Sequence, residues 1–184
     1  MMIKPVIKTI RAPKLDGARM FTVSEILDLP VIKQRGGRHL NEIAAKKVFK
    51  DNSAFTTSRG CYVYGIRAAK GIKPVYVGKA VEQQLMEEAL SADKICKINT
   101  AILKTRRGTP VVVFVVPDKK PGTVPTVQIG EIESILIQYA FAKNRNIENE
   151  KGVYKPRWFI DGVLNSNPGR RSRKAKAFRS MIGI

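Results

Sequence analysis

Short apolar runs separated by turn-forming residues occupy the middle of the chain. Residues 61–66 and 74–78 are dense in β-branched and aromatic side chains, and Gly71 and Pro74 stand at the junction between them. Two such runs joined by turn-forming residues are typical of a β-hairpin. The pairing places Tyr62 and Tyr76 on adjacent strands, where a phenol can donate, accept or give up a proton.

The residues that follow predict helices around one further strand. Residues 82–90 are helical in composition, and apolar positions recur at helical spacing in residues 94–105 and 128–143. Residues 111–116 form a continuous β-branched run. Such a run is expected in a central strand that is buried on both faces. We therefore expect an α/β (α+β) fold, with a small three-stranded sheet covered by helices.

The first third of the chain predicts a basic extension that is partly helical. A capping-box pattern at residues 22–25 predicts a helix over residues 24–29, and apolar spacing predicts a second helix over residues 39–50. These two helices could be a DNA-reading pair. We favour an extension that packs on the hairpin, because the segment between them is long for a helix-turn-helix.

The last residues form a second basic extension. Arg170, Arg171, Arg173 and Lys174 follow a turn-rich segment, and residues 175–182 predict a terminal helix. Trp158-Phe159 could stack on bases or, as we favour, anchor the tail to the core. We expect an N-terminal extension over residues 1–58, a core over 59–150 and a tail over 151–184.

The net charge of the chain indicates which class of partner it binds. The formal net charge is +19, with 34 lysines and arginines against 15 acids, and such an excess favours polyanions. Nucleic acid is the most common polyanionic partner of an intracellular protein, although a structural RNA binder of the ribosome has the same composition. No apolar run approaches the ~20 residues of a membrane span, and the N-terminus lacks the apolar block of a secretory signal. We expect a cytoplasmic protein without a membrane partner, which could associate with the nucleoid.

Cysteine and histidine exclude several kinds of site. Two cysteines, Cys61 and Cys96, are too few for a disulfide framework or a zinc ribbon. The single histidine, His39, excludes paired histidine ligands and has no acidic neighbour in sequence that would make it a base. A site in this chain must therefore use carboxylates, phenols and ammonium groups.

Glu133 is the carboxylate that the helical pattern singles out. The apolar stripe of the helix over residues 128–143 includes Ile132, Ile135, Leu136 and Tyr139, and Glu133 projects beside it while Glu131 faces solvent. A carboxylate in that position is costly unless a cation or hydrogen-bond donors meet it. The cation could be a metal, or a lysine or arginine of the preceding helix.

The hairpin resembles the two signature motifs of the GIY-YIG nuclease family. Gly60-Cys61-Tyr62 stands where that family has Gly-Ile-Tyr, and Tyr76-Val77-Gly78 stands where it has Tyr-Ile-Gly. The resemblance covers residues 60–149. It implies a three-stranded antiparallel sheet flanked by helices, and a metal-dependent endonuclease that hydrolyses phosphodiester bonds.

The resemblance also implies roles for individual residues. Glu133 would bind Mg²⁺ or Mn²⁺, Tyr62 would help to activate water, and Tyr76 would line the site. Lys79 could contact phosphate. An asparagine is expected near the end of the glutamate helix, and among the candidates we choose Asn146. The alternative is that the rings of Tyr62 and Tyr76 only pack in the sheet and have no chemical role.

The sequence departs from the family at one position. The arginine that holds the scissile phosphate should lie near Leu85 or Met86, but residues 81–89 contain no arginine or lysine. Lys94 could substitute in space, although an ammonium neutralises phosphate without gripping it through two hydrogen bonds.

Three functions follow from these residues. The first is an enzyme, a GIY-YIG-type DNA endonuclease whose basic extensions, with Arg170, Arg171, Arg173 and Lys174, hold the duplex. The second is a nucleic-acid-binding module of the same fold that has lost catalysis. The third is a ribosome-associated RNA binder. The nuclease hypothesis, which favours DNA over RNA, requires Tyr62 and Glu133 to converge on one hollow and Glu133 not to be neutralised by an internal cation.

Overall fold

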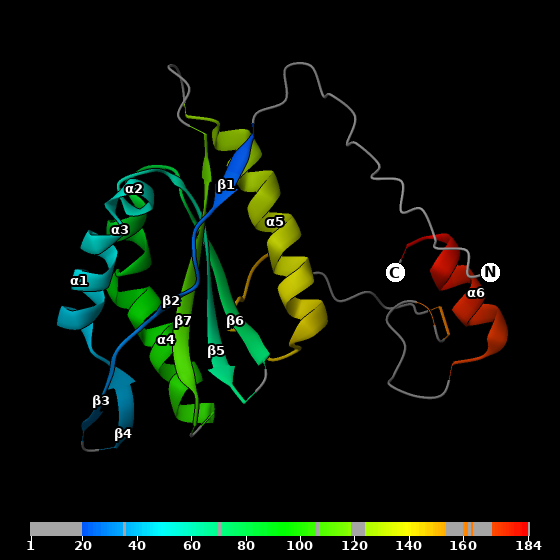
Figure 1. Ribbon diagram of the computed structural model, residues 1–184, viewed down its shortest axis with the longest axis horizontal. Helices are drawn as coiled ribbons and strands as arrows, with labels where there is room; N and C mark the ends of the chain where they lie inside the picture. The colour runs from blue at the N-terminus through cyan, green and yellow to red at the C-terminus, as the bar shows by residue number, and fades with distance from the viewer. Residues whose placement is uncertain are drawn as a thin grey trace, which may run out of the picture.

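A central antiparallel sheet carries helices on both of its faces in the computed structural model (Figure 1). The structure describes residues 20–34, 36–69, 71–105, 107–118, 124–153, 160, 161, 163 and 171–183. The predicted α+β class is confirmed, because helices and antiparallel sheets occur in the same core.

The predicted hairpin is confirmed and is longer than its apolar runs. Strands β5 (Gly60–Ala68) and β6 (Gly71–Ala80) pair antiparallel along their whole length, with a register shift between Tyr64 and Gly65. The third strand, β7 (Thr109–Pro117), pairs with β5 on the other side. The predicted run of residues 111–116 therefore lies in a central strand, and β6 is left at one edge of the sheet.

The sheet has five strands rather than the three expected. The N-terminal segment adds β1 (Phe21–Val23) and β2 (Leu27–Asp28), which both pair with β7. The helix predicted over residues 24–29 is therefore wrong. The Ser24 hydroxyl, which would have capped that helix, accepts a hydrogen bond from the Phe114 amide at 2.9 Å, and the Ser24 amide donates to the Phe114 carbonyl. Pairing with β7 satisfies backbone groups that a one-turn helix would leave unpaired.

A second, two-stranded sheet precedes the first long helix. Strands β3 (Val31–Gln34) and β4 (Gly37–Leu40) form it, and His39 lies in β4. Helix α1 (Glu42–Asp51) begins where the Asn41 side chain accepts from the Ala44 amide, and α2 (Ser53–Thr56) follows. The DNA-reading helix pair does not form, because its first member is a strand.

The remaining predicted helices are confirmed. They are α3 (Leu85–Ala89), which is shorter than expected, α4 (Ala92–Thr105), α5 (Thr126–Lys143) and α6 (Arg173–Met181). Helices α1 to α4 lie on one face of the sheet and α5 lies on the other, whereas α6 lies apart from the sheet (Figure 1). No helix among the described residues is long and apolar enough to cross a membrane.

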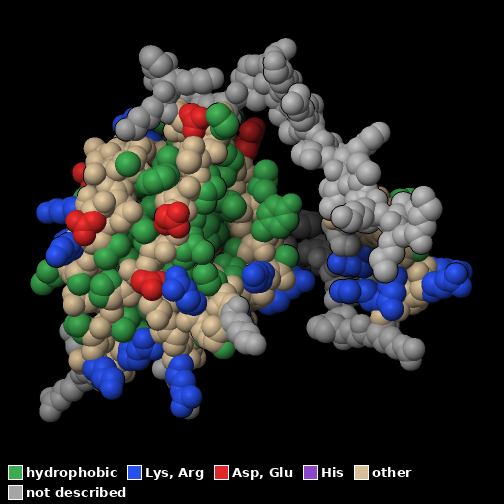
Figure 2. All heavy atoms as spheres, viewed as in Figure 1, with side chains coloured by type: hydrophobic (Ala, Val, Ile, Leu, Met, Phe, Trp, Pro, Cys, Tyr) green, Lys and Arg blue, Asp and Glu red, His purple; other side chains and the backbone are tan. Residues whose placement is uncertain are grey.

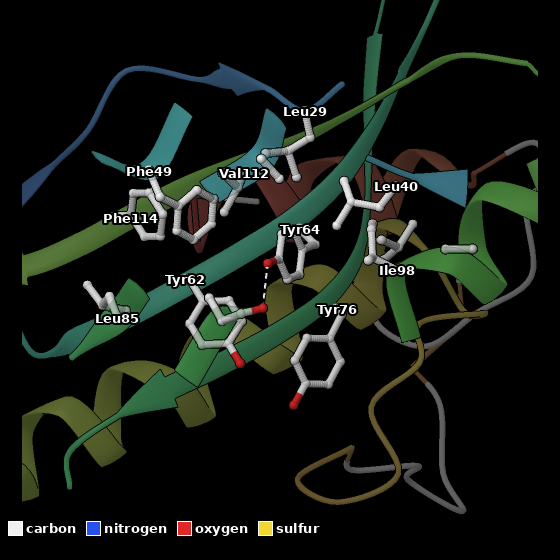
Figure 3. Packing of buried hydrophobic residues seen from close by; sticks show 14 of the residues in the cluster. Leu29, Leu40, Phe49, Tyr62, Tyr64, Tyr76, Leu85, Ile98, Val112 and Phe114 are labelled. Carbon is white, nitrogen blue, oxygen red and sulfur yellow. Dashed lines mark hydrogen bonds between the residues drawn. The ribbon is translucent and has the colours of Figure 1, made fainter. Parts of the chain in front are cut away.

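Alternation along β5 divides the core into two clusters. Tyr62, Tyr64 and Ile66 join the larger cluster with residues of α1 to α4 (Figure 3), while Val63 packs on the smaller cluster with residues of α5. The buried stripe predicted for α5 is wrong in phase, because Ile135 is 55% and Tyr139 is 72% exposed. Apolar residues surround nearly the whole of this helix, so periodicity alone cannot fix which side is buried.

Gly78 allows the two signature segments to pack on each other. It pairs directly with Tyr62, and a Cβ at Gly78 would lie 2.4 Å from both Cζ and the hydroxyl oxygen of the Tyr62 ring. The ring therefore lies across the backbone of β6, where a side chain at position 78 would stand. The glycine of one motif is required by the tyrosine of the other.

We expect Gly78→Ala to lower the free energy of unfolding by about 1–3 kcal/mol, because the buried Tyr62 ring has no space to move away. Urea denaturation measures the change. Gly71→Ala is the matched control in the same strand, because a Cβ there meets nothing within 4 Å, and we expect a change within about 1 kcal/mol. Equal effects at both positions would contradict the packing described for Tyr62.

Candidate functional site

A cleft of about 380 Å³ opens at the free edge of β6, between α4 and α5. Three elements and one loop supply its walls, and the lining residues are Tyr76, Asp93, Lys94, Lys97, Glu133, Ser134, Ile137 and residues 149–152. Tyr76, Lys94 and Glu133, three residues predicted to be catalytic, are therefore brought to one cleft. They come from β6, α4 and α5 respectively.

The segment after α5 closes the backbone edge of β6 next to this cleft. The Asn149 side chain accepts from the Val77 amide at 2.9 Å and donates to the Val77 carbonyl at 2.8 Å, as a neighbouring strand would. The Glu148 amide donates to the Val75 carbonyl, and the Asn144 side chain donates to the Pro74 carbonyl. These bonds fix residues 149–152 as one wall of the cleft.

Asn146, the asparagine chosen from sequence, lies outside the cleft. It is exposed and lines a separate depression with Lys73 and Lys104. Asn149 lines the cleft instead, with its amide group committed to β6. Three asparagines follow α5 within six residues, and no sequence pattern distinguishes the one that pairs with a strand edge.

Tyr76 lies between two ammonium groups. The Lys97 Nζ is 5.4 Å and the Lys94 Nζ is 5.8 Å from the centroid of its ring, which are cation–π distances. The Tyr76 residue is 8% exposed, so only a small part of it can meet a ligand in the cleft.

Acidic partners hold the two lysines of α4. Lys94 is 2.7 Å from Asp93 and 3.7 Å from Glu88, and Lys97 is 3.7 Å from Glu150. Burial opposes the charge of Lys94, but the hydrogen bond to Asp93 and the nearby Tyr76 and Glu88 raise its pKa above the usual value. The hydrogen bond from Lys94 lowers the pKa of the Asp93 carboxyl. Lys94 therefore remains charged across the physiological range.

Glu133 forms an ion pair with Lys79. Its Oε2 is 2.9 Å from the Lys79 Nζ, and the side chains are 19% and 40% exposed respectively. Sequence reasoning raised an ion pair as the alternative to a metal, but expected the partner on the preceding helix rather than on β6. Lys79, expected to contact phosphate, instead contacts the carboxylate expected to bind the metal.

Tyr62 does not meet Glu133 at the cleft. Cys61 pairs with Lys79 and donates a hydrogen bond to the Ile129 carbonyl of α5, so the alternate position 62 faces the helices on the other side of the sheet. Burial raises the pKa of the Cys61 thiol to about 12 and that of the Tyr62 phenol far above its usual value. The convergence of Tyr62 and Glu133 on one hollow, which the sequence analysis required, is absent.

The Tyr62 hydroxyl is buried, and by geometry it lacks a hydrogen-bond partner among the described residues. Its ring lies 5.5 Å from that of Tyr64 and 6.1 Å from that of Tyr76 (Figure 3), yet its oxygen makes no hydrogen bond of normal geometry with any described residue. By contrast, the Tyr64 hydroxyl donates to the Ala89 carbonyl at 2.7 Å. Tyr62 thus fills the space above Gly78 at the cost of an unsatisfied polar atom.

The predicted basic residues lie away from the cleft. Arg171, Arg173 and Lys174 stand at the start of α6 and are exposed, and α6 lies apart from the sheet (Figure 1). Arg170, Trp158 and Phe159 lie outside the described residues. Sequence reasoning missed Lys97, which follows Lys94 by three positions and so shares its helix face, a spacing that could have revealed it.

The donor set at the cleft fits a metal ion only through one carboxylate. No group of three or more His, Cys, Asp or Glu side chains within the described ranges is placed to hold an ion. Magnesium takes one or two protein carboxylates and keeps several waters, so Glu133 alone is compatible with it. The two other cleft acids, Asp93 and Glu150, contact lysines of α4.

Comparisons of the chain with protein-family models, with curated proteins and with solved structures give no match in any of the three.

We expect Tyr62→Phe to leave the free energy of unfolding unchanged or to raise it, because it removes a buried hydroxyl that has no partner. Tyr64→Phe is the matched control two residues away, and it should lower that free energy by about 1–3 kcal/mol by breaking a buried hydrogen bond. Chemical denaturation of both variants measures the difference. A clear loss of stability in Tyr62→Phe would show that its hydroxyl has a partner.

Proposed function

We propose that the protein is a metal-dependent endonuclease of the GIY-YIG type that hydrolyses phosphodiester bonds in DNA at the cleft beside β6. One observation carries this proposal. Tyr76 and Glu133, which the resemblance to that family marks as site residues, and Lys94, the candidate substitute for the missing arginine, come from three separate elements and line the same cleft. Neither local packing nor helix periodicity requires them to meet.

The cleft supplies the groups that this reaction needs. Lys94 and Lys97 would neutralise the scissile phosphate, and Tyr76, which lies beside both ammonium groups, would orient or deprotonate the attacking water. Glu133 would hold Mg²⁺ or Mn²⁺. A bound divalent ion polarises a phosphoryl oxygen and lowers the pKa of a coordinated water. The condition that Tyr62 and Glu133 converge is not met, so this proposal departs from the sequence-based hypothesis and gives the role of Tyr62 to Tyr76.

The ion pair between Lys79 and Glu133 does not prevent metal binding. Pairs between partly exposed side chains contribute about 0–1 kcal/mol, and the Lys79 side chain is 40% exposed on a flexible stem. It is a surface lysine rather than an internal cation, so it can turn into solvent. A divalent ion at Glu133 therefore competes against a weak interaction.

A second candidate is a nucleic-acid-binding module that does not hydrolyse its ligand. Two observations favour it. Helix α3 contains no arginine to hold a phosphate through two hydrogen bonds, and the Tyr62 hydroxyl is sealed away from the cleft. Binding would then depend on the basic residues alone and would need no metal.

Incubation of supercoiled plasmid and of linear duplex with Mg²⁺ or Mn²⁺ tests the first candidate. We expect cleavage that Glu133→Gln reduces by at least about 100-fold, because the carboxylate that binds the cation is lost. Glu131→Gln, on the exposed side of the same helix, is the matched control and should cleave normally. Cleavage by Glu133→Gln at the normal rate would contradict the assignment, and binding without any cleavage would favour the second candidate.

Binding of Mn²⁺ in the absence of DNA tests the role of Lys79. We expect Lys79→Gln to raise the affinity for Mn²⁺ by up to about fivefold, because a competing ion pair worth up to about 1 kcal/mol is removed. Isothermal titration calorimetry measures the affinity, and the double variant with Glu133→Gln serves as the control without the ligand. Equal affinities for Mn²⁺ in Lys79→Gln and in the double variant would show that Glu133 does not bind the ion.

A further inference from the structure

We propose that α6 is a docking surface for the phosphate backbone of duplex DNA, separate from the cleft beside β6. The proposal rests on the proposed function for the identity of the polyanion. Residues 171–183 contain five cations and no acid: Arg171, Arg173, Lys174, Lys176 and Arg179. Their blue side chains gather at one end of the molecule in Figure 2.

The charge of α6 is not balanced within the described part of the chain. At the cleft, Lys94 pairs with Asp93 and Lys97 with Glu150, and Lys79 nearby pairs with Glu133. None of the salt bridges among the described residues includes a residue of α6. Arg179 donates only to the neutral carbonyl of Val163. A bound polyanion would supply the counter-charge that the described residues do not give to this helix.

The positions of the cations also disfavour the helix in isolation. Arg173 and Lys174 stand in its first turn, where the helix dipole is positive and no acid is present. Lys176 is three residues from both Arg173 and Arg179, so like charges are neighbours on the helix surface. A phosphate near the N-terminus would relieve both effects, because the backbone amides and the cations there all favour an anion.

The shape of α6 favours duplex DNA over duplex RNA. Arg173 and Lys176 lie three residues apart on one exposed side of α6, whereas the half-buried Arg179 lies one turn after the buried Ala175 on the other side. A helix of about 10–12 Å diameter fits the B-DNA major groove, which is about 12 Å wide, with phosphates on either side. The major groove of an RNA duplex is too narrow for such contacts.

Anionic lipid is the competing partner for a basic helix of this kind. Phe178 is 39% and Met181 is 73% exposed, and a basic helix with exposed apolar residues can lie on a membrane surface. The net charge of α6 relative to its few apolar residues favours nucleic acid, and vesicles provide the second arm of the test.

The experiment measures the affinity of the full chain for a labelled DNA duplex by fluorescence anisotropy in EDTA, over a range of salt concentrations. The variant Arg173→Gln, Lys174→Gln, Lys176→Gln removes three cations and, by relieving repulsion, should fold normally. We expect weaker binding and a salt slope that falls by about 2.7, at about 0.9 for each phosphate contact. The matched control is Lys46→Gln, Lys47→Gln, Lys50→Gln, three exposed lysines of α1, for which the slope should stay near that of the parent.

The outcomes separate this inference from the proposed function. Equal shifts in both triple variants would mean that only net charge matters and would overturn the docking surface. A larger loss for an RNA duplex, or loss of binding to vesicles of phosphatidylserine and phosphatidylcholine without any change for DNA, would assign α6 to another partner. No DNA binding by the parent chain would overturn the proposed function as well, whereas binding with an unchanged slope in the α6 variant would overturn this inference alone.

Discussion

The packing of the Tyr62 ring over Gly78 is the constraint on which the rest of the structure depends. It locks β5 to β6 in one register, so that Tyr76 pairs with Tyr64 and Lys79 pairs with Cys61. A slip of one residue would exchange the two faces of β6 and send Lys79 into the larger core. In this register Tyr76 faces α4 and Lys79 faces α5. The cleft forms where these two faces of the sheet end, at the edge of β6.

The edge of β6 both needs protection from pairing with another chain and provides the place for the cleft. An unpaired strand edge exposes backbone donors and acceptors that invite pairing with another chain. Here the loop after α5 satisfies part of that edge, and the Asn149 amide substitutes for a neighbouring strand. Because the cover is a loop rather than a full strand, side chains from both helix layers can meet beside it. The same feature protects the edge and leaves room for a ligand.

Sequence patterns predicted the elements well where packing and local preference agree. The hairpin, the central strand and helices α4 and α5 follow from composition and spacing. The prediction failed at residues 24–29, where a valid capping pattern was overridden by pairing of Ser24 with β7, a contact ninety residues away along the chain. It also failed on the phase of α5, because a helix that is apolar on most sides carries no phase information. A local sequence pattern carries no information about which distant strand a segment pairs with.

The sequence analysis named candidate site residues but did not predict how they are arranged in space. The resemblance to the nuclease motifs marked Tyr76 and Glu133, the helical pattern also singled out Glu133, and Lys94 is the first cation after a helix that has none. The separation of Tyr62 from Glu133 depends on strand alternation, which the sequence does contain, since position 62 and position 79 belong to opposite faces once Tyr62 is paired with Gly78. The pairing of Glu133 with Lys79 needed the tilt of α5 over β6, which no sequence pattern supplies.

The ion pair at Glu133 is itself a consequence of where the carboxylate stands. The Glu133 side chain is 19% exposed, and a cation beside such a carboxylate offsets the cost of burying its charge. Lys79 is that cation in this structure. An ion pair with a purely structural role would contribute most to stability if the stem of the lysine were packed and its ammonium group bonded to further acceptors. Lys79 has one acidic contact and a 40% exposed side chain, so it neutralises Glu133 without securing it, and the carboxylate stays accessible to a stronger cation.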